Sequence, residues 1–352
     1  MLEKKTSLII VGCGFLGKAA ASLFCSQGYS VLGIVRTPLE PIFHTDHNEE
    51  VVKASAVMRV MNSHDIGADT DYPRKTSCST QHPSGFTVST SDEHQTSGLV
   101  KHSPTEKSYS LLSCDVTDPL AVDALTKNIP PESLLIYCVS SGKGGSDTYA
   151  AIYRDGLERL LHSWKPKRAL FVSSTSVYGQ KDGEIVTESS SAEPDRETGR
   201  ILLEAEKIAL QSGGVVARLS GIYGPGRSML LRKFLEGTAT LENGGGRLIN
   251  QIHRDDAASA LFCLMTHENA SGIYNVTDDT PASQREVYAW ISEALQKPLP
   301  PPGPADLNRK RGWTSKQISN EKLHTLGWAP QFPSYREALP ELIEEILLKR
   351  ED

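Results

Sequence analysis

The sequence contains no Cys-x-x-Cys pair, although six of its 352 residues are cysteines. Structural zinc sites commonly use ligands in such close pairs, and disulfide frameworks are typical of short secreted chains. The cysteines instead lie scattered, mostly within apolar runs. We therefore expect reduced, buried thiols and no metal site at these positions: Cys13, Cys25, Cys78, Cys114, Cys138 and Cys263.

Long hydrophobic runs and a basic excess are also absent. No apolar run approaches the roughly 20 residues that span a bilayer. Residues 1–6 lead into an apolar stretch at 7–11 that is too short for the core of a signal peptide. The formal net charge is −6, whereas nucleic-acid-binding proteins usually carry a basic excess. We predict a cytoplasmic protein that binds a small-molecule substrate and has no nucleic-acid or membrane partner. Its oligomeric state stays open, a homodimer included.

What the sequence does contain is an alternation of short apolar strands and amphipathic helices. Strand, helix and strand at this spacing predict parallel βαβ units, and six such strands are the number in a doubly wound dinucleotide-binding sheet. We therefore predict an α/β fold, with a Rossmann domain over residues 1–220. The expected helices are 16–27, 119–128, 148–163 and 197–211, and the expected strands are 7–11, 30–35, 109–114, 133–139, 168–172 and 215–219.

Two further regions complete the predicted organisation. Residues 38–108 are rich in Ser, Thr, His, Asp and Pro. A histidine-dense segment could bind a metal, but these histidines lack the spacing of metal ligands, and few apolar residues offset the entropy of folding. We favour a disordered insertion at about 40–106, with a short helix at 51–60. Residues 221–352 predict a smaller α+β substrate-binding region with helices at 255–267, 283–296 and 335–348.

The heptapeptide Val-Gly-Cys-Gly-Phe-Leu-Gly, which ends the first predicted strand, fits the G-x-G-x-x-G pattern. Gly12 permits the tight turn, Gly14 lets a pyrophosphate approach the backbone, and Gly17 lets the next helix pack close to the strand. The free N–H groups at the start of that helix favour phosphates. We predict a dinucleotide site here, which also includes Phe15 and Leu16.

The residue that follows the second predicted strand selects the cofactor. An acidic residue there would bind the ribose 2′-hydroxyl of NAD, but this chain has Arg36, and the nearest acid, Glu40, lies beyond Pro38. A guanidinium can bind a 2′-phosphate through two hydrogen bonds. We therefore predict NADP(H) rather than NAD(H). The alternative interpretation of Arg36 is a solvated charge at the end of a strand.

Several longer motifs follow in order along the chain. They are Cys-Asp-Val-Thr-Asp at 114–118, Phe-Val-Ser-Ser-Thr-Ser-Val-Tyr-Gly at 171–179, Arg-Leu-Ser-Gly-Ile-Tyr-Gly-Pro-Gly at 218–226, Ile-His-Arg-Asp-Asp at 252–256, Gly-Ile-Tyr-Asn-Val at 272–276 and the segment 319–328. Together these motifs resemble those of the extended short-chain dehydrogenase/reductase family, the NAD-dependent epimerase/dehydratase group. The resemblance covers nearly the whole chain outside the insertion.

The resemblance implies roles for individual residues. Asp115, beside Val116, matches the aspartate that holds the adenine amino group of the cofactor. Val139 and Ser140, at the end of the fourth predicted strand, complete the expected cofactor site. Ser174, four residues before the tyrosine of the 171–179 motif, matches the catalytic serine of the family.

One departure from the family pattern affects the chemistry. The family places a Tyr-x-x-x-Lys pair about twenty residues after the Val-Tyr-Gly tripeptide. In that pair the tyrosine transfers a proton, and the lysine lowers its pKa and holds the ribose. Thr198 and Leu202 occupy these two positions here. The usual acid–base pair is therefore missing, as in atypical members of the superfamily such as the YeeZ-type subgroup, which the chain also resembles.

Four side chains remain as candidates for chemistry, each with a structural alternative. Ser174 could bind a substrate oxygen or cap a loop, and Tyr178 could act as a substitute acid or be a packed aromatic. Arg227 could bind an anionic group of the substrate or be a surface charge. His253 could contact the substrate and titrate near neutral pH, or fix a loop through hydrogen bonds.

Asp255 and Asp256 are interpreted as structural. Both are expected to open a helix, where carboxylates complement the free N–H groups and the helix dipole.

Two hypotheses about function follow from this sequence. The first is an NAD(P)-dependent oxidoreductase or epimerase-like enzyme that acts on a small carbonyl, hydroxyl or nucleotide-sugar-like substrate. The second is a catalytically deficient NADP(H)-binding sensor or scaffold. The missing tyrosine and lysine favour the second hypothesis, whereas a substrate region of full length favours the first.

Overall fold

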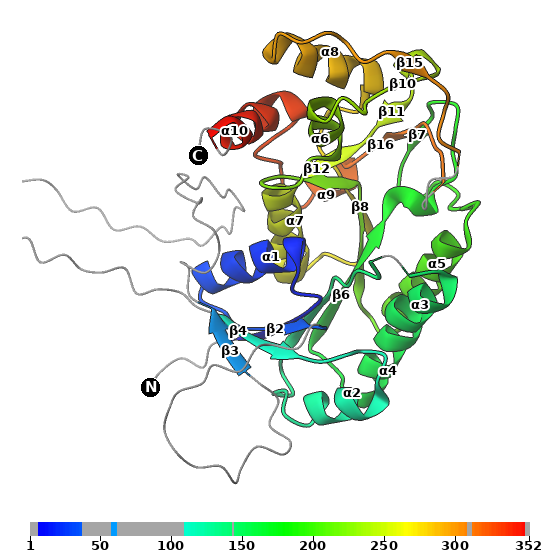
Figure 1. Ribbon diagram of the computed structural model, residues 1–352. Helices are drawn as coiled ribbons and strands as arrows, with labels where there is room; N and C mark the ends of the chain where they lie inside the picture. The colour runs from blue at the N-terminus through cyan, green and yellow to red at the C-terminus, as the bar shows by residue number, and fades with distance from the viewer. Residues whose placement is uncertain (1–5, 37–57, 62–108, 143, 308–311, 349–352) are drawn as a thin grey trace, which may run out of the picture.

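The protein is built on a mixed eight-stranded sheet (Figure 1). The structure is a computed structural model and describes residues 6–36, 58–61, 109–142, 144–307 and 312–348. In spatial order the strands are β13, β8, β6, β5, β1, β2, β4 and β3. Their bounds are β1 Ser7–Val11, β2 Ser30–Val35, β3 Met58–Met61, β4 Tyr109–Ser113, β5 Leu134–Tyr137, β6 Arg168–Ser174, β8 Val215–Leu219 and β13 Gly272–Val276.

The predicted doubly wound sheet is confirmed. Each of the six expected strands is present, the six pair in parallel with one another, and their order reverses between β1 and β5. The register joins Ile9 to Leu32 on one side and to Leu135 on the other. Two strands extend this sheet beyond the prediction. Strand β13 is parallel to β8, and β3 is antiparallel to β4.

Strand β3 corrects one local prediction. We expected a helix at 51–60, but Met58–Met61 forms an edge strand, and residues 51–57 lie outside the described part of the chain. The exposed backbone of β4 supplies hydrogen bonds that the local pattern of side chains does not reveal. The rest of the predicted insertion also lies outside the described residues.

Helices cover both faces of the sheet (Figure 1). On one face, α1 (Phe15–Ser26) packs against α7 (Arg254–Thr266), which belongs to the C-terminal part of the chain. On the other face lie α2 (Pro119–Thr126), α4 (Gly156–Ser163) and α5 (Glu197–Gln211). Each face buries its own cluster of apolar side chains. Within the described residues, the search for a helix long and apolar enough to span a bilayer finds none.

The helix expected at 148–163 is interrupted. Its first turn is α3 (Ser146–Ala150), a π-turn follows at η2 (Ala151–Asp155), and the α-helical pattern resumes in α4. A short 3₁₀ turn, η3 (Thr175–Val177), follows β6. The 3₁₀ turn thus lies just after a strand of the sheet, where ligands of such folds bind, whereas the π-turn follows a helical turn.

The remaining elements form a smaller α+β part with its own apolar cluster. Short strands pair two by two there, and its longest helices are α8 and α10. The predicted division of the chain at residue 220 stays a prediction. Strand β13 and helix α7, which come after residue 220, join the central sheet and its helical cover. The bounds are β7 Ile185–Val186, β9 Gly221–Tyr223, α6 Met229–Leu235, β10 Leu241–Glu242, η4 Asn243–Gly245, β11 Leu248–Ile249, β12 Gln251–His253, β14 Ala282–Ser283, α8 Gln284–Ala294, β15 Pro302–Gly303, β16 Gln317–Ile318, α9 Glu321–His324 and α10 Tyr335–Leu348.

Candidate dinucleotide site

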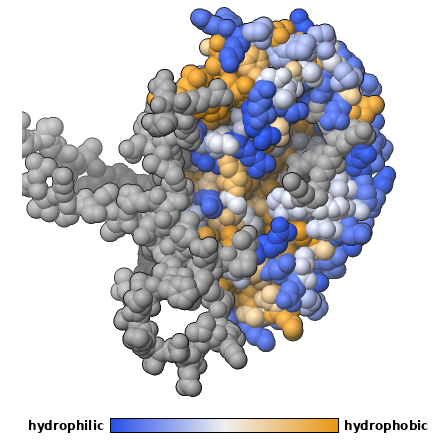
Figure 2. Space-filling model, in the orientation of Figure 1, coloured by the Kyte–Doolittle hydropathy of each residue, from blue (hydrophilic) through white to orange (hydrophobic). Residues whose placement is uncertain are grey.

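A cavity of about 700 Å³ opens at the carboxyl ends of the central strands. It lies at the point where the strand order reverses, which is the usual ligand site of open α/β sheets. On the face shown in Figure 2, hydrophilic and hydrophobic side chains both surround the central hollow. The predicted cofactor residues that line the cavity are Gly12, Gly14, Phe15, Leu16, Arg36, Asp115, Val116, Val139 and Ser140.

The glycine loop has the geometry of a phosphate cradle. Gly12 has a φ of 94°, and a Cβ atom there would lie 2.6 Å from the Cys138 carbonyl oxygen. Gly17 does not line the cavity; a Cβ atom there would lie 2.6 Å from the Gly12 carbonyl oxygen, so this glycine serves close packing. Around Gly14 the space for a Cβ atom is empty. No side chain caps the N-terminus of α1, which leaves its N–H groups for an anion.

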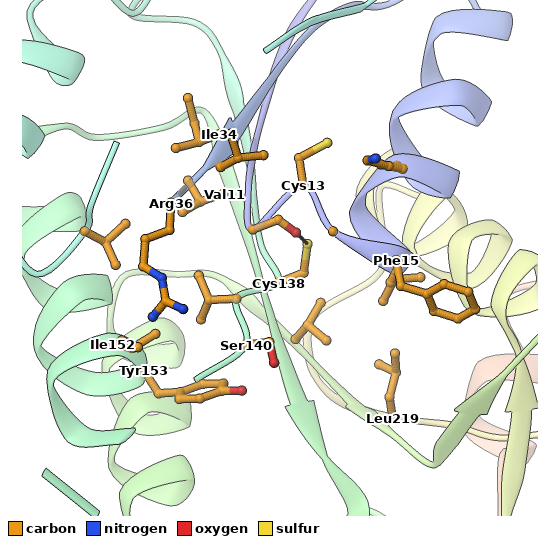
Figure 3. Close-up of a pocket in the computed structure, with 18 of the residues that line it drawn as sticks. Val11, Cys13, Phe15, Ile34, Arg36, Cys138, Ser140, Ile152, Tyr153 and Leu219 are labelled. Carbon is orange, nitrogen blue, oxygen red and sulfur yellow. Dashed lines mark hydrogen bonds between the residues drawn. The ribbon is translucent and has the colours of Figure 1, made fainter. Parts of the chain in front are cut away.

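Three cationic side chains line the cavity: Lys18, Arg36 and Arg227. None of them forms an ion pair with another residue that the structure describes. The Arg36 side chain extends into the cavity toward Ile152 and Tyr153 (Figure 3). Unpaired cations in a concave site attract an anionic ligand. We missed Lys18 in the sequence, although its place after the third glycine, in the first turn of the helix, is a usable signal.

The segment after β4 supplies polar groups to the same cavity. The Asp115 carboxylate accepts hydrogen bonds from the Thr117 backbone N–H at 2.9 Å and from its hydroxyl at 2.8 Å, both through Oδ1. Oδ2 has no partner among the described residues. Asp118 caps α2 by accepting from the Leu120 N–H at 2.9 Å. The loop is therefore held by its own side chains, and one oxygen of Asp115 can accept a hydrogen bond from a ligand.

Ser174 lines the cavity at the end of β6. Its Oγ accepts a hydrogen bond from the Ser176 N–H at 3.2 Å, so it also caps η3. Leu202 lines the cavity as well, with 1% of its surface exposed, whereas Thr198 does not line it. The wall that would carry a lysine in the family is thus apolar.

Tyr178 lies outside the cavity lining and is fully buried. Its hydroxyl donates to Asn275 Oδ1 at 2.9 Å, and the Arg218 guanidinium lies 4.7 Å from the ring centroid. Arg218 in turn forms a buried ion pair with Glu206 at 2.6 Å. Burial raises the pKa of Tyr178, although Arg218 opposes the shift. These contacts fit the packed-aromatic interpretation, since they tie the ring to β8 and β13.

His253 is buried and also lies outside the cavity lining. It is the N-cap of α7, and its Nδ1 accepts from the Asp255 N–H at 3.3 Å. Burial lowers the pKa of His253 to about 4. These contacts fit the loop-fixing interpretation.

The two aspartates that follow differ in their contacts. The Asp255 carboxylate pairs with Arg254 at 2.7 Å. The Asp256 carboxylate accepts from the backbone N–H groups of Gln331 and Phe332, at 2.7 and 2.9 Å, and so ties α7 to the C-terminal loop. Burial raises the pKa of Asp256 to about 6.

Arg227 lies at the end of a tight turn. Its backbone N–H and carbonyl both bond to Gly224, each at 2.9 Å, and its guanidinium lies 5.1 Å from the centroid of the Phe15 ring. The Arg254 guanidinium lies 5.4 Å from the same ring. The glycine loop and the C-terminal part therefore meet at Phe15, beside the cavity.

Comparisons with known proteins place these observations in a family context. A model described as the NAD dependent epimerase/dehydratase family matches residues 80–277, more than half of the chain. The 3-diazoavenalumate denitrifying reductase of a Streptomyces species is 32% identical over 158 residues, which are 40% of this chain and 52% of that protein. This chain thus spans about half the length of that relative.

Two further comparisons cover more of the chain. Protein YeeZ of Escherichia coli (strain K12) is 28% identical over 231 residues, 63% of this chain and 77% of YeeZ. The fold is similar to that of MoeE5 in complex with UDP-glucose and NAD, with a TM-score of 0.68 at 19% identity over 97% of this chain and 99% of that one. The resemblance inferred from the sequence motifs is confirmed.

Proposed function

Because this chain belongs to the NAD-dependent epimerase/dehydratase family, we propose that it is an NADP(H)-dependent reductase of a small molecule. The residues present fit a dinucleotide. The loop at Gly12 and Gly14 and the uncapped start of α1 suit a pyrophosphate. Asp115 and Val116 line the part of the cavity that suits an adenine. When bound, the cofactor would supply a hydride from its nicotinamide ring.

The observation that carries the choice of NADP(H) is that Lys18 and Arg36 both line the cavity and that neither forms an ion pair with a residue that the structure describes. Arg36 follows β2, and Lys18 lies in the first turn of α1. Burial raises the pKa of Cys13 to about 12, and the nearby charge of Lys18 opposes this shift. A Cβ atom at Gly33 of β2 would lie 2.6 Å from the Cys13 sulfur. Cys13 thus lies against β2, and Lys18 and Arg36 line the same cavity, so both cations can face a 2′-phosphate.

The polar groups of the site favour reduction over epimerisation. An epimerase must remove a proton from a hydroxyl and return it, which requires an acid–base group beside the nicotinamide. Leu202 is apolar, and the Tyr178 hydroxyl is buried and already donates a hydrogen bond to Asn275. A reduction in one direction needs only that the acceptor is oriented and that a proton reaches it afterwards. In this proposal Ser174 orients the acceptor, and Arg227 binds an anionic group of the substrate. The relative named as a reductase supports the same direction.

Calorimetric titration with NADPH and NADH tests the cofactor assignment. Wild type should bind NADPH more tightly. Arg36→Ala should weaken NADPH binding by roughly 1.5–3 kcal/mol, the value of a charged hydrogen bond, and should leave NADH binding nearly unchanged. Lys18→Met should act in the same direction with a smaller effect, since the ammonium is exposed. Equal affinity of wild type for the two cofactors would contradict the assignment.

Turnover is tested separately, by following NADPH consumption with a panel of small aldehydes, ketones and diazo compounds that carry a carboxylate or phosphate. We expect wild type to reduce at least one compound of the panel. Arg227→Ala should slow this reaction by raising the KM for that compound. Tight NADPH binding without any turnover would instead support the sensor or scaffold hypothesis, which the apolar wall at Leu202 favours.

A further inference from the structure

The π-turn at Ala151–Asp155 shapes one wall of the cavity. A π-turn shifts the backbone bonding by one residue and leaves a carbonyl without its usual partner. Here the hydroxyl of Tyr137, at the end of β5, donates to the Ile152 carbonyl at 2.5 Å, and both groups are buried. Gly156 makes room for this bond, because a Cβ atom there would lie 2.7 Å from the Tyr137 hydroxyl. The turn is therefore fixed from the sheet.

The π-turn carries Tyr153 into the cavity. The Tyr149 and Tyr153 rings stack with centroids 4.2 Å apart and planes 24° apart, and both rings line the cavity. In Figure 3 the Tyr153 hydroxyl points toward Ser140, at the carboxyl end of β5. The π-turn also packs against α5, the helix that carries Leu202. A phenol thus lies in the same cavity as the apolar wall that replaces the lysine.

We propose that the Tyr153 hydroxyl binds the nicotinamide-ribose half of the dinucleotide and that the Tyr137–Ile152 bond positions it. This inference rests on the proposed cofactor. The adenosine half belongs beside β2 and β4, where Arg36 and Asp115 lie. A pyrophosphate held at the glycine loop, which follows β1, would leave the other half of the dinucleotide to extend over β5 and β6. Arg36 extends toward the Tyr153 ring from the adenosine side, whereas the Tyr153 hydroxyl points away from Arg36 toward Ser140 (Figure 3). A phenol can both donate to and accept from ribose hydroxyls.

The test compares NADPH with adenosine 2′,5′-bisphosphate, which lacks the nicotinamide half. Tyr153→Phe keeps the stacked ring and should weaken NADPH binding about three- to tenfold, the effect of one lost neutral hydrogen bond. Its affinity for the bisphosphate should equal that of wild type. Tyr29→Phe is the matched control, because it removes a phenol hydroxyl from a ring that packs against Phe24 outside the cavity lining, and it should leave NADPH affinity unchanged.

The positioning role of Tyr137 is tested by a double-mutant cycle. Tyr137→Phe should weaken NADPH binding in the wild-type background and have little further effect in the Tyr153→Phe background. Additive effects would overturn the positioning role. Equal NADPH affinity of wild type and Tyr153→Phe would overturn the proposal, as would equal weakening of NADPH and the bisphosphate. Failure of wild type to bind NADPH at all would count against the proposed function instead.

Discussion

At the scale of single residues, the first two glycines of the phosphate loop have different roles. Gly12 adopts a φ of 94° and packs against the backbone at Cys138, so its small size serves the fold. Gly14 has a negative φ of −94°, and its missing side chain leaves open space at the cavity. Glycine is thus needed at position 12 for its backbone conformation, and at position 14 to leave room for a ligand.

This difference gives a prediction with an internal control. Gly14→Val should fold normally and weaken NADPH binding by about tenfold or more, because the side chain fills the space that the pyrophosphate needs. Gly12→Ala should lower the free energy of unfolding by about 2 kcal/mol or more, since an L-residue is strained at that φ and clashes with the Cys138 carbonyl. Chemical denaturation and calorimetry measure the two effects. Wild-type NADPH affinity in folded Gly14→Val would remove the loop from the site.

At the scale of elements, α7 illustrates how buried titratable groups join the C-terminal part to the Rossmann part. Its N-cap, His253, packs against Tyr223 and Phe332, and Asp256 in its first turn holds the 331–332 backbone. Burial shifts the two pKa values in opposite senses, to about 4 for His253 and to about 6 for Asp256. Both groups therefore titrate abnormally within the same acidic window.

His253 and Asp256 change the free energy of unfolding with pH in opposite directions. The pKa of His253 is lower in the folded chain than in the unfolded one, so its stabilisation is complete above about pH 6.5 and is lost as the pH falls toward 4. The pKa of Asp256 is raised, so its contribution grows as the pH falls from about 6 toward 3.8. The two effects partly cancel in wild type.

His253→Asn should expose this balance, because asparagine retains an N-cap acceptor but does not titrate. As the pH falls from 7 to 4.5, the free energy of unfolding of the variant should rise relative to that of wild type, by up to about 2.5 kcal/mol. Urea denaturation at several pH values measures the difference. A constant difference across this range would show that His253 titrates normally in the folded protein.

At the scale of the whole molecule, the strands and the glycine loop could be predicted because their signals are local. The six strands follow from apolar runs, Arg36 follows from its position after the second strand, and Asp115 follows from the resemblance to the family. Strand β13 was missed as part of the sheet because only the fold brings Gly272–Val276 beside β8. Tyr153 was missed because a π-turn changes which face of the helix each later residue occupies. The hydrogen bond from Tyr137 to Ile152 that fixes this turn joins residues 15 positions apart, so no local pattern reveals it.

The pairing of β13 with β8 and of α7 with α1 predicts that the chain unfolds as one unit. In α7, Leu261 and Leu264 are fully buried in the same apolar cluster as Phe24 of α1. Leu261→Ala should therefore lower the free energy of unfolding by about 2–5 kcal/mol, as Phe24→Ala should by a similar amount, each through a single transition. Circular dichroism and loss of NADPH binding should report the same midpoint for each variant.

A fragment ending at residue 220 provides the stricter form of this test. It would lack β13 and α7, so the edge of β8 and the apolar face of α1 would both be exposed to water. We expect it to show no cooperative unfolding transition and to bind a hydrophobic dye. Cooperative unfolding of this fragment, or a Leu261→Ala variant in which only part of the signal shifts, would instead support two independently folding domains divided near residue 220. The cavity would then be completed by docking of the second domain, and NADPH affinity would depend on that docking rather than on the stability of the sheet.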